Sequence, residues 1–318
     1  MKWETEITNL LHIKYPIVQG GLAYLAYADL AAAVSNAGGL GQITAMSLDG
    51  PEALRAEIRK VKTLTDNPFG VNFAIGQHGR RFDHMVQVAI DEEIPVISVT
   101  GGNPKGVLDM VQDYPIKTLV LTAARRQAEK AEELGADAVM VVGHEGGGHL
   151  GRGDTGTFVL TPQVADSVSI PVIASGGIVD GQGMMAALAL GAEGIEMGTR
   201  FIATKECVDA HPAYKQALVE ADENATVVIK RSLGTPARAL KNIWTDEILE
   251  IERQHGDYES LKAHISGEAN KTYIHEGNAE KGFGWAGQGS GSIRDIPTVD
   301  ELMHNIIDEA AAVRRKWS

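Results

Sequence analysis

Eight short apolar runs recur at a regular interval along the first two-thirds of the chain. The first begins near Ile17 and the last near Gly194, which gives an average spacing of about 25 residues. Each run is nearly continuous in apolar character and ends in glycine or a polar residue, as parallel strands buried on both faces do. The predicted strands are 16–21, 40–44, 69–75, 96–102, 117–123, 138–149, 171–177 and 194–200.

Helical patterns separate these runs. Leu54, Ile58 and Val61 form an apolar stripe behind a first-turn Pro51, and residues 125–134 form a second helical segment. Thr161-Pro162 predicts the start of a third helix. Eight strands alternating with helices predict an α/β protein with a (β/α)8 TIM barrel, because a doubly wound open sheet normally uses fewer strands.

The pattern changes after the eighth strand. Residues 207–282 are rich in charge and helix formers, and we expect a helical insertion or lid there. Residues 277–292 form a glycine-rich loop, and the stripe within 299–315 predicts a closing amphipathic helix. The predicted units are therefore a barrel made of 1–206 and 283–318, and a lid made of 207–282.

Composition excludes several classes of protein. A net charge of −13 argues against nucleic acid or an anionic membrane as a partner. No apolar run reaches the roughly 18 residues of a membrane helix, and the first residues lack the apolar core of a signal peptide. The single cysteine excludes an intramolecular disulfide and predicts a cytoplasmic protein. We interpret Cys207 as inert, and we keep a homodimer as the assembly to test.

Glycine is enriched, with 36 residues in 318. The informative glycines gather where the predicted strands end, which is the rim where barrels build active sites. The last two strand ends carry Ser175-Gly176-Gly177 and Met197-Gly198-Thr199, which offer N–H donors and hydroxyls at the recurrent phosphate position of barrels. The alternative is that these glycines only permit tight turns. We favour a phosphate-bearing cofactor.

The sequence HEGGGH at 144–149 lies in the longest interval between strands. Its spacing is wrong for the helical HExxH zinc motif and three glycines would break a helix, so no metal is predicted. A histidine on a glycine-rich rim loop can move a proton at neutral pH, and His149 is the catalytic candidate. The alternative is a histidine that braces the loop, which is the role we expect of His144.

Gln19 and Asn72 are polar residues inside apolar runs. Buried polar groups must be paired, so each side chain either contacts a cofactor ring or makes a core hydrogen bond. The residues alone leave both interpretations open.

Several motifs in order resemble the FMN-dependent nitronate monooxygenase family, whose relatives include FMN enoyl-acyl-carrier-protein reductases and NAD(P)H:quinone reductases. The motifs are PIVQGGL, NAGGLG, PFGVN, GADAV, EGGGHLG, PVIASGGIVDG, GAEGIEMGTRF, HPAYK, TPARALKN and WAGQ. EGGGH replaces the commoner EAGGH, and some members carry lysine at the end of strand five, where this chain has Thr122.

The resemblance implies a barrel that carries FMN and no metal. It assigns Gln19, Gly20, Gly21 and Asn72 to the flavin ring, and His149 to the position above the cofactor. The full set of expected cofactor contacts is Gln19, Gly20, Gly21, Asn72, Thr122, Gly148, Ser175, Gly176, Gly177, Met197, Gly198, Thr199 and Gln288.

Three functions follow as hypotheses. The first is oxidation of alkyl nitronates, or of the parent nitroalkanes, by O2 to a carbonyl compound and nitrite, with His149 as base or cationic partner. The second is NAD(P)H-dependent reduction of a quinone or an enoyl thioester on acyl-carrier protein, with His149 as proton donor. The third is a non-catalytic flavin-binding barrel. The choice among small-molecule substrates depends on pocket walls that sequence does not assemble.

Overall fold

The strands form one eight-stranded parallel sheet that closes on itself. The computed structural model describes residues 2–76 and 81–316. Neighbouring strands pair in the order β1-β9-β8-β6-β5-β4-β3-β2, and Leu40 N–H donates to Ile17 O at 2.9 Å to join the two ends. The predicted (β/α)8 barrel is confirmed, and its strands are β1 Ile17–Gln19, β2 Gly41–Thr44, β3 Phe69–Ala74, β4 Val96–Thr100, β5 Lys117–Thr122, β6 Ala138–Val142, β8 Val172–Ser175 and β9 Gly194–Met197.

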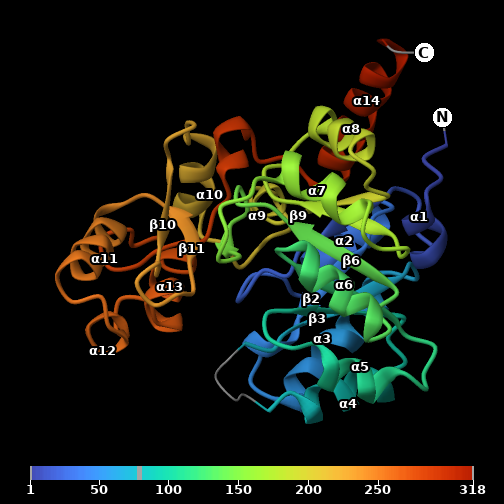
Figure 1. Ribbon diagram of the computed structural model, residues 1–318, viewed down its shortest axis with the longest axis horizontal. Coiled ribbons are helices and arrows are strands. Elements are labelled where there is room, and N and C mark those ends of the chain that lie inside the picture. Colours follow the sequence, from blue (N-terminus) through green and yellow to red (C-terminus); the bar gives the residue numbers. More distant parts are fainter. Residues whose placement is uncertain (1, 77–80, 317–318) are drawn as a thin grey trace.

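Helices surround the sheet, as Figure 1 shows. The ring contains α2 Ala28–Asn36, α3 Pro51–Leu64, α4 Asp83–Asp91, α5 Lys105–Val111, α6 Arg125–Glu133, α7 Thr157–Ala165 and α8 Gly181–Ala189. The eighth place is taken by α14 Val299–Lys316, which packs against both α8 and α2. Gly181 permits this close packing, because a Cβ there would lie 2.3 Å from Ile306 O. The predicted closing helix therefore completes the ring although it follows β9 by about a hundred residues.

The barrel interior is apolar towards the amino ends of the strands. Val18, Leu119, Met140 and Ile173 form this layer, and Ile7 from α1 Glu6–Leu11 packs beneath it. Burial of these side chains supplies the main driving force for closing the barrel. Apolar side chains therefore fill the barrel at the amino ends of the strands, which we call its floor, and polar groups concentrate at the opposite end.

The segment after β9 contains the predicted helices and, in addition, a two-stranded hairpin that the sequence analysis did not predict. It begins with α9 Thr199–Ile202 and α10 Pro212–Val219, and then forms a hairpin from β10 Thr226–Ile229 and β11 Ala237–Leu240. Three further helices follow: α11 Ile243–Gln254, α12 Tyr258–Leu261 and α13 Gly267–Ile274. The first strand, Thr-Val-Val-Ile, does carry the β-branched residues that indicate a strand and was overlooked, whereas the second, Ala-Arg-Ala-Leu, lacks them.

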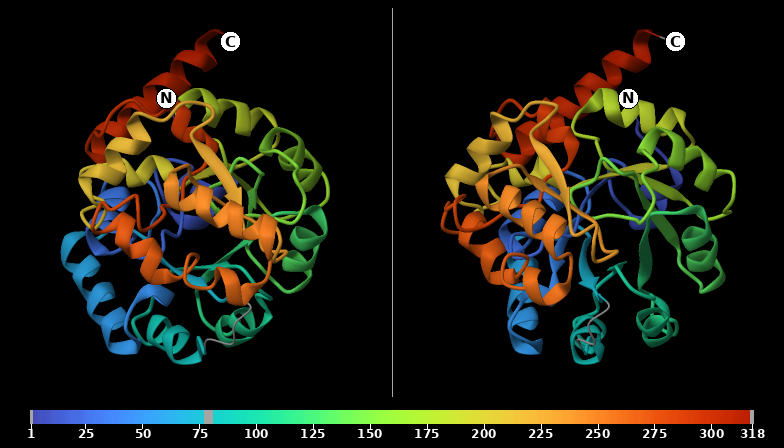
Figure 2. Two further views of the ribbon diagram at one scale, coloured as in Figure 1. Left: turned by 90° about the vertical axis from the view of Figure 1, so that its left-hand side faces the viewer. Right: turned by 60° about the vertical axis from the view of Figure 1, so that its left-hand side comes forward.

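This extension lies across one end of the barrel, as Figure 2 shows. β11 pairs in antiparallel fashion with the short strand β7 Gly148–His149, which belongs to the loop after β6. The extension is thus attached to the carboxyl-end rim by backbone hydrogen bonds. The division into a barrel and a separate unit at 207–282 stays a proposal.

The third helix begins earlier than the sequence predicted. α7 starts at Thr157 with Gly156 at its N-cap, and Pro162 lies inside the helix. The Glu145 carboxylate accepts the Thr157 N–H at 2.8 Å, so a residue of the loop that leads into α7 caps this helix. Within the described residues, no helix is both long and apolar enough to cross a membrane.

Candidate functional site

Three loops at the carboxyl-end rim are held together by backbone contacts. Gln288 N–H donates to Glu145 O at 2.9 Å, and Gly287 N–H donates to Thr199 Oγ1 at 2.9 Å. The contact is so close that a Cβ on Gly147 would lie 2.6 Å from Gly287 N. The loop after β6, the loop after β9 and the late glycine-rich loop therefore form one continuous surface.

A second set of contacts fixes the loop after β8. The Glu145 carboxylate accepts hydrogen bonds from the backbone and the hydroxyl of Thr157, at 2.8 and 3.1 Å. Thr157 Oγ1 also lies 2.8 Å from Gly176 O, so its single proton is shared between this carbonyl and the Glu145 carboxylate. Sequence reasoning missed both residues, although Glu145 stands inside the HEGGGH motif.

Bare backbone amides point to a phosphate position at the ends of β8 and β9. Gly176 and Gly177 have φ of +95° and +77°, which favour glycine. The N–H groups of Gly177, Gly198 and Thr199 donate no hydrogen bond to the rest of the chain as described (2–76 and 81–316). Free amides at the last two strand ends are the recurrent phosphate-binding arrangement of barrels.

Two predicted phosphate contacts turn their side chains away from this position. The Ser175 hydroxyl is hydrogen-bonded to Glu196, a carboxyl group enclosed in the barrel. Burial raises the pKa of Glu196, and the Ser175 hydrogen bond opposes that rise. The Met197 side chain is buried in the core between the sheet and its helices. At both positions only the backbone can contact a ligand at the rim.

A polar layer lies above the apolar floor of the barrel. Asn72 Nδ2 donates to Ser98 Oγ at 2.9 Å, and Ser98 Oγ donates to Gln42 Oε1. Gln19 Oε1 accepts from Gln42 N–H at 2.9 Å, which extends the short seam between β1 and β2. The Gln19 amide therefore makes a core hydrogen bond, one of the two roles left open by its sequence. Gln42 and Ser98 were not predicted.

The glycine pair after β1 lies directly on this layer. A Cβ on Gly21 would lie 2.4 Å from Asn72 Oδ1, and one on Gly20 would lie 3.1 Å from Glu196 Oε1. Neither position accepts a larger residue without displacing an interior polar group. The structure thus brings Gly20, Gly21 and Asn72 together at the barrel mouth.

His149 lies where the extension meets the rim. Its side chain is exposed, its Nε2 lies 2.8 Å from Lys230 Nζ, and its ring centroid lies 5.6 Å from that of Trp285. The pairing of β7 with β11 fixes its backbone, with His149 opposite Ala237. Burial lowers the pKa of Lys230 to about 8, with Glu252 opposing the change. His149 stays the catalytic residue that the sequence predicts, and Lys230 was not singled out from the sequence.

His144 has a different environment from His149. Its backbone carbonyl accepts from both Arg238 Nε and Nη2, at 3.2 and 3.0 Å, and its Nδ1 lies 3.5 Å from the Asp154 carboxylate. Burial lowers the pKa of His144, and the positive charges of Arg238 and Arg231 lower it further. These contacts are those of a residue that braces the loop, as the sequence analysis expected.

Other predicted residues do not present side chains to the site. Thr122 shares its face of β5 with Val120, which packs in the outer core, and its hydroxyl lies 3.4 Å from Met140 O. It stays a prediction without geometric support. Gln288 is exposed and is tied to the rim through its backbone. Cys207 is fully buried, which raises its pKa to about 12 and keeps the thiol unreactive.

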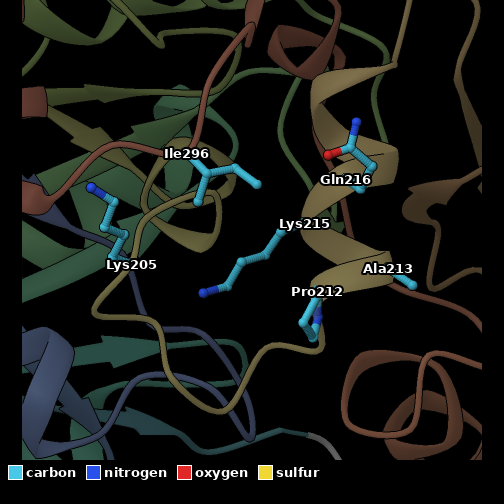
Figure 3. A pocket seen from close by; sticks show the side chains of 6 residues that line it. All are labelled: Lys205, Pro212, Ala213, Lys215, Gln216 and Ile296. Carbon is cyan, nitrogen blue, oxygen red and sulfur yellow. The ribbon is translucent and has the colours of Figure 1, made fainter.

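A separate cavity of about 630 Å³ opens between α10 and the segments that carry Lys205 and Ile296. Figure 3 shows Lys215 projecting from α10 into this space. Lys215 Nζ donates to Thr204 O at 2.6 Å, so this lysine is engaged by the fold. None of the residues that line the cavity belongs to the rim described above, so it is not the cofactor site.

Fold and rim together define a barrel enzyme that binds a phosphate-bearing cofactor. The family model for nitronate monooxygenase matches residues 4–79 and 73–309, and the chain belongs to this family. A probable nitronate monooxygenase of Staphylococcus saprophyticus is 30% identical, with 99% of this chain and 100% of that protein covered. Relatives described in the same words from Staphylococcus aureus reach 32% identity, covering 96% of this chain and 97% of theirs.

Two solved structures are similar over nearly their whole length. FabK from Thermotoga maritima is 39% identical with a TM-score of 0.93, covering 99% of this chain and 98% of that one. Nitroalkane oxidase from Streptomyces ansochromogenes is 29% identical with a TM-score of 0.82, covering 98% and 99%. The chain is accordingly an oxidoreductase of the FMN-dependent type.

The residues present fit this cofactor. The free amides of Gly177, Gly198 and Thr199 suit a phosphate, and no side chain at the glycine positions fills the rim. Gly20 and Gly21 leave the barrel mouth bare beside Asn72, where a flat ring system can approach the backbone.

Proposed function

We propose that the protein oxidises alkyl nitronates with O2. Two nitronate ions and one O2 give two carbonyl molecules and two nitrite ions, which balances atoms and charge. The observation that carries the proposal is the position of His149, an exposed imidazole held by β-pairing beside the cofactor rim. FMN, when bound, supplies the electron-accepting centre of this chemistry.

The chain's own residues bind and orient the reactants. Gly177, Gly198 and Thr199 would hold the phosphate, and Gly20 and Gly21 would lie against the ring. Neutral His149 has one nitrogen that can accept a proton, so it can act as the base on a neutral nitroalkane. The phosphate contacts lie on rigid strand ends, so the cofactor position does not depend on the substrate.

The test is an assay for nitrite. The FMN-loaded protein is mixed in air with propionate 3-nitronate, and nitrite is measured between pH 6 and 9. We expect stoichiometric nitrite from the nitronate, and a loss of activity on the neutral nitroalkane in His149→Gln. Absence of nitrite across this pH range would rule out the proposal.

A second candidate is NAD(P)H-dependent reduction of an enoyl thioester. The observation that favours it is the higher identity to FabK, 39% against 29% for the nitroalkane oxidase. In that reaction His149 would supply the proton that the reduced substrate needs. The net charge of −13 weighs against docking of an acidic carrier protein, although a smaller thioester avoids this repulsion.

One anaerobic experiment separates the two candidates. Bleaching of the flavin absorbance by a nitronate, and not by NADH or NADPH, is the result expected of the first. Bleaching by NADH or NADPH followed by reoxidation with crotonyl-coenzyme A is the result expected of the second.

A further inference from the structure

The tip of the β10–β11 hairpin places a lysine at the barrel mouth. Lys230 follows β10 directly and adopts a left-handed backbone conformation with φ of +64°, which a non-glycine residue rarely adopts. Its N–H donates to Glu252 Oε2 at 2.9 Å, and Ser232 N–H donates to Glu252 Oε1 at 2.9 Å. One carboxylate from α11 therefore holds the turn in a costly conformation, and such strain often accompanies function.

The same turn is docked on the rim loop. Arg231 Nη1 pairs with the Asp154 carboxylate at 3.1 Å, and Leu150 N–H donates to Pro236 O at 2.9 Å. The Lys230 side chain is thereby aimed at His149, with Nζ 2.8 Å from Nε2, and lies over the Trp285 ring at 5.9 Å. Its position is set from both sides, by the extension and by the barrel.

The Lys230 ammonium group has N–H donors that find no acceptor among the described residues. An ammonium carries three N–H donors, and within the described residues one of them has an acceptor, His149 Nε2. Glu252 interacts with Lys230 through the backbone N–H and through charge at a distance, without an ion pair to Nζ. A half-buried cation with two donors that find no acceptor within 2–76 and 81–316, facing an exposed histidine, is suited to bind an anionic oxygen.

We propose that Lys230 is a substrate-binding residue whose ammonium group holds a small planar oxyanion, the nitro-group oxygens of a nitronate, beside His149. This inference rests on the proposed function for the identity of the oxyanion. The residue would act on substrate affinity more than on the chemical step.

The pH dependence of anion binding follows from the groups that face Lys230. These are His149 from β7 and Glu252 from α11, while the neighbouring Arg231 is paired with Asp154. With a pKa of about 8 the ammonium is mostly protonated at pH 7, and about 3% of it remains at pH 9.5. Anion affinity should therefore fall about 30-fold between these pH values, since nitrate itself does not titrate.

The experiment uses nitrate as an unreactive planar anion. Its binding to the FMN-loaded protein is followed by the change in flavin absorbance at pH 7 and pH 9.5. We expect wild type to weaken about 30-fold at the higher pH. Lys230→Met should bind at least tenfold more weakly at pH 7, Lys230→Arg should bind equally at both pH values, and the exposed control Lys241→Met should behave as wild type.

The outcomes are distinguishable from those of the nitrite assay. If Lys230→Met loses FMN, the comparison of wild type with Lys230→Arg still decides, because arginine stays charged at pH 9.5. Equal nitrate affinity in wild type and Lys230→Met, or the same pH dependence in Lys230→Arg and wild type, overturns the role of Lys230 even when nitronates are oxidised. If nitrate binding depends on Lys230 but no nitrite is produced, the result supports the anion site and rules out the proposed function.

Discussion

Gly147 is the position where the packing of the rim loops can be tested most directly. A Cβ added there would lie 2.6 Å from Gly287 N and 2.7 Å from the Ala286 carbonyl carbon, both backbone atoms. Ordinary contact begins near 3.4 Å, so the late loop must move away by about 0.8 Å in Gly147→Ala. A shift of that size takes two 2.9 Å hydrogen bonds, Gln288 N–H to Glu145 O and Gly287 N–H to Thr199 Oγ1, out of range.

The loss of these two bonds sets the expected magnitude. At about 1 kcal/mol each, the variant should be destabilised by about 2 kcal/mol, which lowers Tm by about 4 °C. Because the displaced loop is the one that braces Thr199 in the predicted phosphate loop, its shift of nearly 1 Å should also reduce turnover by about 100-fold. The same kind of substitution at Gly153, where the nearest atom to a Cβ is Thr155 Oγ1 at 4.0 Å, is the matched control.

The measurements are thermal unfolding, FMN affinity by fluorescence quenching, and turnover with the substrate that the nitrite or anaerobic assay identifies. Gly153→Ala should match wild type in all three. If Gly147→Ala also matches wild type in all three measurements, the backbone contacts do not hold the three loops tightly together. The assignment of the late loop to the cofactor site is then wrong.

Three further predictions concern buried groups. The pKa of Glu196 is raised in the folded state, so its contribution to stability is full below about pH 4.3 and declines as pH rises towards the folded pKa. Glu196→Gln removes that decline, and urea unfolding at pH 5 and pH 8 should show the variant gaining relative to wild type; parallel curves would contradict this. Cys207, with a pKa near 12 and no exposed surface, should not react with a thiol reagent until the protein is unfolded, and prompt labelling of the native protein would refute its burial. Thr157→Val should lower the free energy of unfolding by about 1 to 3 kcal/mol and weaken FMN binding, because the Gly176 carbonyl and the Glu145 carboxylate lose the hydroxyl that they share. Thr63→Val, which removes an exposed hydroxyl on α3, is the control.

The sequence predicted the barrel well because its signals are local. Each barrel strand is a short apolar run with a glycine or polar end, and buried parallel strands require that pattern. The glycines at 176 and 177 were also identifiable, since a loop that turns sharply at the end of a strand through positive φ needs them whatever its partners are. Proximity among the eight strand ends then follows from the closed topology alone.

The parts that sequence did not predict depend on contacts between distant segments. Gln42 and Ser98 are polar residues inside two different short strands, and only the closed barrel shows that they bond to one another. Lys230 carries no local signal, because its position depends on Glu252 in α11 and on the pairing of β11 with β7. Thr122 was assigned from a family position, and the alternation of β5 directs its side chain to the helices instead.

The two proposals together would place the groups that hold the cofactor and the groups that contact the substrate on different parts of the fold. The predicted phosphate and ring contacts belong to loops fixed on barrel strands, and these depend on glycine backbone that other side chains cannot replace. His149 and Lys230 instead meet at a seam, since β7 belongs to the barrel and the hairpin to the extension. A change in the hairpin can therefore alter the charge presented to the substrate without disturbing the amides that would bind phosphate. On this proposal, the barrel that the chain shares with FabK and nitroalkane oxidase would keep one cofactor position while the hairpin changes the groups that face the substrate.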